Sequence, residues 1–185
     1  MSDVSFFDFL KIRASFGVLG NDQISNDRFL YLQSYNINAG RFPNAVFGDG
    51  NVYPTIVEGS LASPNVTWET VEKFDIGLDA FFLDARLSLT ADYFYEKRTD
   101  ILGRRNLTVP EFFGVSLPVE NLNRIDNRGV EVSIGYEEQL TDNWFISVNT
   151  NLTHAKNEVV FWDEPEDINP NLSRIGHPLG MAFGY

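Results

Sequence analysis

The 185-residue chain contains no cysteine, only two histidines and no apolar run long enough to form a transmembrane helix. Without cysteine it can form neither disulfides nor thiolate metal sites. His154 and His177 are isolated, and neither has the partner spacing of a catalytic triad or a metal site. Basic residues are also scarce, with 14 Lys and Arg against 26 Asp and Glu, so the chain cannot neutralise the phosphates of a nucleic acid. We therefore expect no enzyme active site, no cofactor, no metal centre and no nucleic-acid partner.

The chain does contain segments that alternate apolar and polar residues. From Gly129 to Leu152 two such runs flank the short break Thr141-Asp142-Asn143, which predicts a β-hairpin. Phe145 is the one apolar residue on the polar side. Similar alternation predicts strands near residues 10–16, 74–82 and 87–96, with further candidates at 28–35 and 175–185. The pattern indicates an all-β, antiparallel fold.

The predicted connections between these strands differ in length in an ordered way. Turns at 82–86 and 141–143 are short, whereas the connections at 17–67, 101–127 and 160–173 are long. Along an up-and-down sheet, every short turn then falls at one end and every long loop at the other. Outer-membrane β-barrels have this asymmetry, with short periplasmic turns and long extracellular loops.

Alternation alone leaves open which face of the strands meets water. In a soluble β-sandwich the apolar face forms the core, whereas in a membrane barrel it faces lipid and the polar face lines the interior. Aromatic residues stand at two levels on the predicted apolar face, as in the interfacial girdles of a barrel. Phe82, Tyr136 and Trp144 lie beside short turns, and Phe74, Tyr93 and Tyr95 lie toward the long loops. This placement favours a barrel over a sandwich.

Five groups of short motifs follow one another along the chain in an order and spacing that are specific together. They are Leu10–Gly17; Pro64–Glu69 with Phe74–Asp79; Asp92–Leu102; Asn121–Leu122 with Asn127–Glu131; and Gly176–Gly180 with Gly184–Tyr185. On these motifs the chain resembles the SusC/RagA family of TonB-dependent outer-membrane transporters. Ser63 departs from the family, which commonly has Asn there.

The resemblance implies a transmembrane barrel of about 22 strands with a plugged lumen. Residues 1–185 would form an incomplete segment of roughly six strands, without the plug domain and the closing strands. The expected location is the outer membrane of a Gram-negative, Bacteroides-type bacterium. The family imports glycans or peptides with a SusD-like surface lipoprotein, driven by TonB-ExbB-ExbD through an N-terminal region that this chain lacks. The alternative is a soluble, secreted β-sandwich that binds carbohydrate.

Aromatic residues in the predicted long loops are the candidate ligand or partner contacts. They are Phe112, Phe113 and Trp162, with Tyr31, Phe42 and Phe47 as further candidates. Exposed rings stack on sugars or cover a partner surface, although loop aromatics also pack loops against one another. The acidic run Asp163–Asp167 has the oxygen ligands that a hard cation prefers, but Pro165 within it favours a solvated loop.

Overall fold

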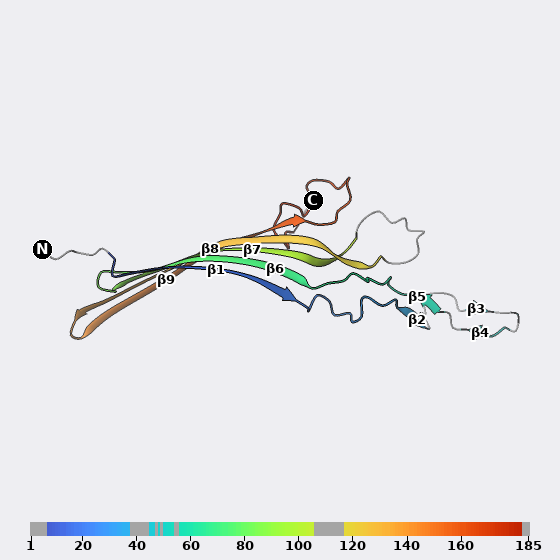
Figure 1. The fold of residues 1–185 in the computed structure, drawn as a ribbon, viewed down its shortest axis with the longest axis horizontal. Helices are drawn as coiled ribbons and strands as arrows, with labels where there is room; N and C mark the ends of the chain where they lie inside the picture. Colours follow the sequence, from blue (N-terminus) through green and yellow to red (C-terminus); the bar gives the residue numbers. More distant parts are fainter. Residues whose placement is uncertain are drawn as a thin grey trace.

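The computed structural model describes residues 7–37, 45–46, 48, 50–53, 56–105 and 117–182. Its main feature is one five-stranded antiparallel sheet in the order β1-β6-β7-β8-β9 (Figure 1). The strands are β1 (Phe9–Asn21), β6 (Glu69–Phe82), β7 (Leu87–Arg104), β8 (Val119–Thr141) and β9 (Trp144–Phe161). Within the long connection from β1 to β6, β2 (Tyr35–Ile37) pairs with β5 (Ile56–Glu58), and β3 (Ala45–Val46) pairs with β4 (Val52–Tyr53). The described residues include no helix long and apolar enough to cross a membrane.

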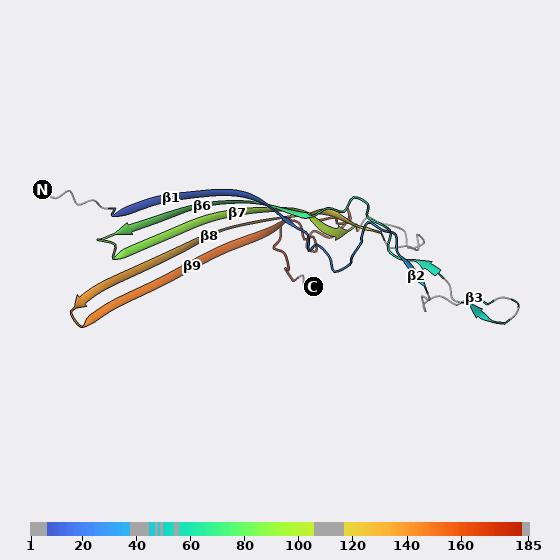
Figure 2. The same cartoon turned by 60° about the horizontal axis from the view of Figure 1, so that its bottom comes forward.

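The main sheet is a single curved layer. Figures 1 and 2 show no second sheet stacked on it. Among the described residues only Ala80, Ile125 and Val159 are buried hydrophobic side chains, whereas Ile12 and Leu152 are 70% and 67% exposed. A sandwich buries its apolar face against a second sheet. The sandwich alternative is therefore wrong for this part of the chain.

The strand register confirms the two predicted faces of the hairpin. Val132 lies opposite Leu152 and Tyr136 opposite Val148, while Ser133 lies opposite Asn151. Phe145 pairs with Gln139 on the polar side, as expected. Because side chains alternate along every strand, the sheet has one apolar face, which carries Val132 and Leu152, and one polar face, which carries Ser133 and Asn151.

The ordered connections are also confirmed. In Figure 2 the β6–β7 and β8–β9 turns lie together at one end of the sheet, and the long connections lie at the other. The β6–β7 turn is built from Leu83, Asp84 and Ala85, all with positive φ (59°, 56° and 64°). Three hydrogen bonds hold this conformation. The Ala85 amide donates to Asp8 Oδ2 at 3.0 Å, and the Leu83 carbonyl accepts from Arg86 Nε at 2.8 Å and from the Arg86 amide at 3.3 Å.

Several predictions of strands and of their bounds were wrong. The connection predicted at 17–67 is 22–68, because β1 continues to Asn21 and β6 begins at Glu69. The connection predicted at 101–127 is only 105–118, because β7 continues to Arg104 and β8 begins at Val119. A bulge at Asp100, which has a φ of 59°, shifts the β7–β8 register there and disturbs the alternation. The strand predicted at 28–35 is instead a turn, with Phe29 at φ 60° and a hydrogen bond from the Leu32 amide to the Phe29 carbonyl. Residues 175–182 form turns, and the rest of that predicted strand lies outside the described residues.

Candidate functional site

The polar face carries charged residues that pair across strands. Arg13 on β1 reaches over Gly77 to acidic residues on two other strands: its Nε lies 2.9 Å from Asp79 Oδ2 on β6, and its Nη2 lies 2.9 Å from Asp92 Oδ1 on β7. A Cβ on Gly77 would collide with Asp92 and with the Arg13 guanidinium. Glycine at position 77 therefore makes this three-strand bridge possible.

A second ion pair lies nearer the loop end of the polar face, four residues along β6 from Gly77. Lys73 Nζ lies 3.0 Å from Glu96 Oε1 and 4.0 Å from Asp75 Oδ1. Together with the Arg13 pairs it borders a shallow hollow of about 470 Å³, whose lining includes two cations but four carboxylates, of Asp75, Asp92, Glu96 and Glu131. The polar face is thus net acidic around this hollow, and a polar surface of this kind is typical of the interior of an outer-membrane barrel.

The apolar face is bounded by charged side chains at both ends. At the turn end Arg86 Nη1 lies 2.7 Å from Glu138 Oε2, which also accepts a 2.7 Å hydrogen bond from the Tyr136 hydroxyl. The hydrogen bond to Glu138 and its negative charge raise the pKa of Arg86. At the loop end Lys97 pairs with Glu72 at 3.3 Å, and Arg124 pairs with Asp126 at 3.1 Å. Between these pairs the face is mainly apolar and aromatic.

A single asparagine fastens the long β1–β6 connection to the loop end of the sheet. The side chain of Asn121 on β8 accepts a hydrogen bond from the Thr67 amide at 2.9 Å. It donates hydrogen bonds to the Thr67 carbonyl at 2.9 Å and to the Asp100 carbonyl at 2.6 Å. Next to it Trp68 covers Gly20, where an added Cβ would lie 2.9 Å from the indole ring. The Pro64–Glu69 motif therefore has a structural role, since it docks the connection onto β1 and β8.

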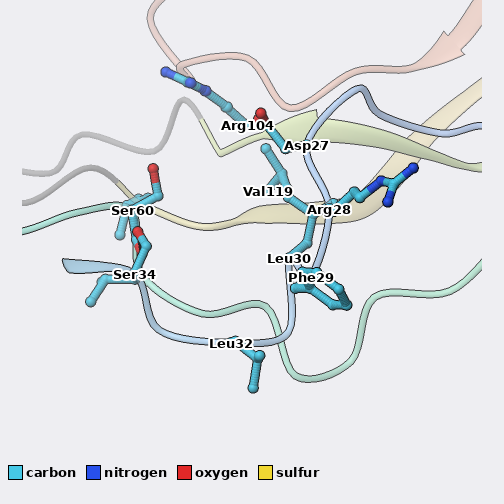
Figure 3. A pocket seen from close by; sticks show the side chains of 11 residues that line it. Asp27, Arg28, Phe29, Leu30, Leu32, Ser34, Ser60, Arg104 and Val119 are labelled. Carbon is cyan, nitrogen blue, oxygen red and sulfur yellow. Dashed lines mark hydrogen bonds between the residues drawn. The ribbon is translucent and has the colours of Figure 1, made fainter. Parts of the chain in front are cut away.

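The loop end also contains a cavity of about 290 Å³ between the β1–β6 connection and the adjoining ends of β7 and β8 (Figure 3). Phe29, Leu30 and Leu32 supply apolar surface, and Ser34 and Ser60 supply hydroxyls. Arg28 and Arg104 also line the cavity, but Figure 3 shows their side chains pointing in different directions. They do not form a two-armed clamp for one anion.

The predicted contact residue Trp162 follows β9 directly. The Arg174 guanidinium lies 5.0 Å from the centre of its ring, within the range of a cation–π contact. Glu164 keeps Arg174 close to the ring. Its carboxylate accepts hydrogen bonds from the Arg174 backbone amide and from the Ser173 hydroxyl, both at 2.7 Å. One face of the indole is thus occupied by the loop itself.

The other predicted contacts are divided between described and undescribed parts of the chain. Phe112, Phe113, Phe42 and Phe47 lie outside the described residues. Tyr31 is 53% exposed and stands edge-on to Phe29, with ring centres 6.2 Å apart. The structure does not bring Tyr31 and Trp162 into a common site, and all six remain predictions. In the described ranges no group of His, Asp and Glu is arranged to hold a metal ion.

Sequence reasoning did not identify Arg13 as the centre of the polar-face network. Its partners are 66 and 79 positions away, and only the register of three strands brings them together. The only available signal was the position of all three charges on the polar side of alternating segments.

Comparisons with known proteins agree with this geometry. The family model for the β-barrel of TonB-dependent receptor-like proteins matches residues 6–181. TonB-dependent receptor P3 of Formosa agariphila is 31% identical over 95% of the chain, and TonB-dependent receptor SusC of Bacteroides thetaiotaomicron is 28% identical over 86%. The solved RagAB peptide importer in its 'open-open' state superposes with a TM-score of 0.71 over 93% of the chain at 21% identity, which shows a shared fold.

The chain is much shorter than these relatives. It spans 18% of receptor P3, 15% of SusC and 18% of the RagAB chain. The sheet therefore corresponds to a small arc of the barrel in those proteins.

Proposed function

Since the chain belongs to the TonB-dependent receptor-like β-barrel family, we propose that it forms part of the barrel wall of an outer-membrane nutrient importer. Its apolar face contacts lipid, and its polar face lines the interior. The observation that carries this proposal is the single-layered sheet with an exposed apolar face on one side and ion-paired polar residues on the other. In outer-membrane barrels lipid covers an apolar face of this kind.

The cargo and partners of the whole importer follow from its relatives. SusC and the RagAB peptide importer support glycans or peptides as the imported class. We infer a SusD-like surface lipoprotein as the partner at the loop end. Energy would come from TonB-ExbB-ExbD through the plug region, which lies outside residues 1–185. The exposed ring of Tyr31 and the half-buried ring of Trp162 remain candidate contacts for cargo or lipoprotein, together with Phe112 and Phe113.

Lipid quenching tests the assignment of the two faces. In the full-length receptor, cysteines at Val132 and Ile146 carry a fluorophore on the apolar face, and cysteines at Ser133 and Asn149 carry it on the polar face. Brominated acyl chains should quench Val132→Cys and Ile146→Cys strongly, because these positions lie within the lipid band. Ser133→Cys and Asn149→Cys should keep their emission. Equal quenching at all four positions, or quenching at none, would rule out this barrel orientation.

A further inference from the structure

Two cations face each other at the loop end of the apolar face. Arg128 on β8 lies directly opposite Lys156 on β9, and His154 follows one row closer to the turns, opposite Val130. Like charges placed opposite each other destabilise a strand pair. This pair therefore requires negative charge from its surroundings.

The neighbouring acidic residues do not supply enough of that charge. Asp126 is engaged by Arg124 and by the Tyr95 hydroxyl, and Glu72 by Lys97. Glu158 lies 3.6 Å from Lys156, but no acidic side chain of the described residues lies within ion-pair distance of Arg128. The chain as a whole carries a net charge of −12, so a surplus of positive charge at this point is a local feature.

The next segment of the chain does not compensate these cations either. The Val159 amide donates to the His177 carbonyl at 2.9 Å, and the Gly176 amide donates to the Val159 carbonyl at 2.8 Å. Beyond this contact the chain turns again, since the Met181 amide donates to the Pro178 carbonyl at 3.2 Å and Gly180 has a φ of 83°. Residues 178–182 of this turn carry no charged side chain.

The height of the cluster matches the headgroup region of a membrane. Trp144, 70% exposed, marks the turn end of the apolar face on β9. From Trp144 to Lys156 the strand runs about 40 Å at the usual rise per residue. With the usual tilt of barrel strands this corresponds to about 30 Å of height, which equals the thickness of the hydrocarbon core. Arg128 and Lys156 therefore stand just above the lipid tails on the side of the long loops.

We propose that Arg128, Lys156 and His154 bind the phosphate of an anionic lipid headgroup in the outer leaflet, an inference that rests on the proposed membrane-barrel function. A guanidinium can bind a phosphate through two parallel hydrogen bonds. The ammonium of Lys156 adds a point charge. The imidazole of His154 can donate a hydrogen bond to the phosphate from the side nearer the lipid tails. The lipid tails of the same molecule then cover Leu152 and Val132, which continue the apolar face toward the turns.

The test uses the full-length receptor in nanodiscs of phosphatidylcholine that contain or lack phosphatidylglycerol. Native mass spectrometry measures the affinity for phosphatidylglycerol of the wild type and of the double variant Arg128→Gln/Lys156→Gln. Each basic residue near a membrane surface contributes about 1 kcal/mol of attraction to anionic lipid, so the double variant should bind about 30-fold more weakly. Lys11→Gln/Arg98→Gln removes the same charge from exposed positions of the polar face and should bind like the wild type.

The possible outcomes separate this site from the barrel assignment. Equal affinity of the wild type and Arg128→Gln/Lys156→Gln would overturn the lipid site. Equal weakening by the control variant would do the same, because it would reveal a nonspecific charge effect. Thermal protection of the detergent-solubilised receptor by inorganic phosphate, as strong as that by phosphatidylglycerol, would overturn the lipid as the source of the phosphate. Lipid quenching at Val132→Cys decides separately whether the proposed function holds.

Discussion

At the scale of single residues, the close approach of neighbouring strands depends on a few glycines. A Cβ on Gly129 would lie 2.6 Å from the His154 carbonyl oxygen and 2.6 Å from Cζ of Phe94, which covers the glycine from the adjacent strand. A Cβ on Gly135 would meet only the ends of the Ser88 and Asn149 side chains, and one on Gly17 would meet nothing within 4 Å. At Gly129 the obstacle includes backbone, which cannot move aside. At Gly135 the obstacles are the ends of side chains, which can rotate away.

Alanine substitutions should therefore differ in cost. Gly129→Ala should destabilise the folded barrel by about 1–3 kcal/mol, the range for an overpacked site. Gly135→Ala should cost less, and Gly17→Ala should be neutral or slightly stabilising, because alanine restricts the unfolded chain more than glycine does. Urea unfolding of the full-length protein in lipid vesicles measures the three values. A cost for Gly17→Ala as large as that for Gly129→Ala would contradict this steric explanation.

At the scale of the element, the two faces of the β8–β9 hairpin differ in polarity. Val132 and Ile146 are on the apolar face, and their neighbours Ser133 and Ser147 are on the polar face beside other hydrogen-bonding side chains. In a membrane, adjacent positions on one strand thus have very different tolerance of charge.

Arginine substitutions measure this difference. Val132→Arg and Ile146→Arg should each cost roughly 2–4 kcal/mol near the bilayer midplane and reduce the amount of heat-modifiable barrel in the outer membrane. Ser133→Arg, one position along the same strand, should leave that amount unchanged because its side chain enters the aqueous interior. Loss of barrel with Ser133→Arg comparable to the loss with Val132→Arg would contradict the face assignment.

At the scale of the whole molecule, the sheet has two unlike ends and two edges. The short turns lie at one end and the long connections at the other (Figure 2). β1 and β9 are the edge strands of the described sheet, and unpaired edges are where a barrel continues or a fragment aggregates. Because short turns lie at one end and long connections at the other, the two ends of the full-length barrel should meet different compartments.

Cysteine labelling determines which compartment each end meets. Asp142→Cys in the β8–β9 turn and Asp167→Cys in the connection after β9 both place the thiol at an exposed position. On intact cells a membrane-impermeant maleimide should label Asp167→Cys alone, and Asp142→Cys should react only after the outer membrane is permeabilised. Labelling of Asp142→Cys on intact cells would invert the topology.

Features that depend on neighbouring residues could be predicted from the sequence, and features that depend on residues far apart in the chain could not. Alternation identified the faces of Val132, Leu152 and Phe145, and the short turns at Ala85 and Asp142, because period two and turn chemistry are local properties of the chain. The strand ends near Arg104 and Val119 were missed, since charged and amide side chains appear on both faces at the loop end and the Asp100 bulge interrupts the alternation.

The sequence by itself determined that this protein is built from amphipathic antiparallel strands with short and long connections in alternation. Alternation is the same for a soluble sandwich and a membrane barrel, so it could not decide which face is wet. The tertiary structure excluded the sandwich for the described residues by showing one layer with both faces uncovered. It also brought Arg13 to Asp79 and Asp92, Asn121 to Thr67, and Arg128 to Lys156. Each of these contacts depends on the register between strands, which many backbone hydrogen bonds set together and no single segment encodes.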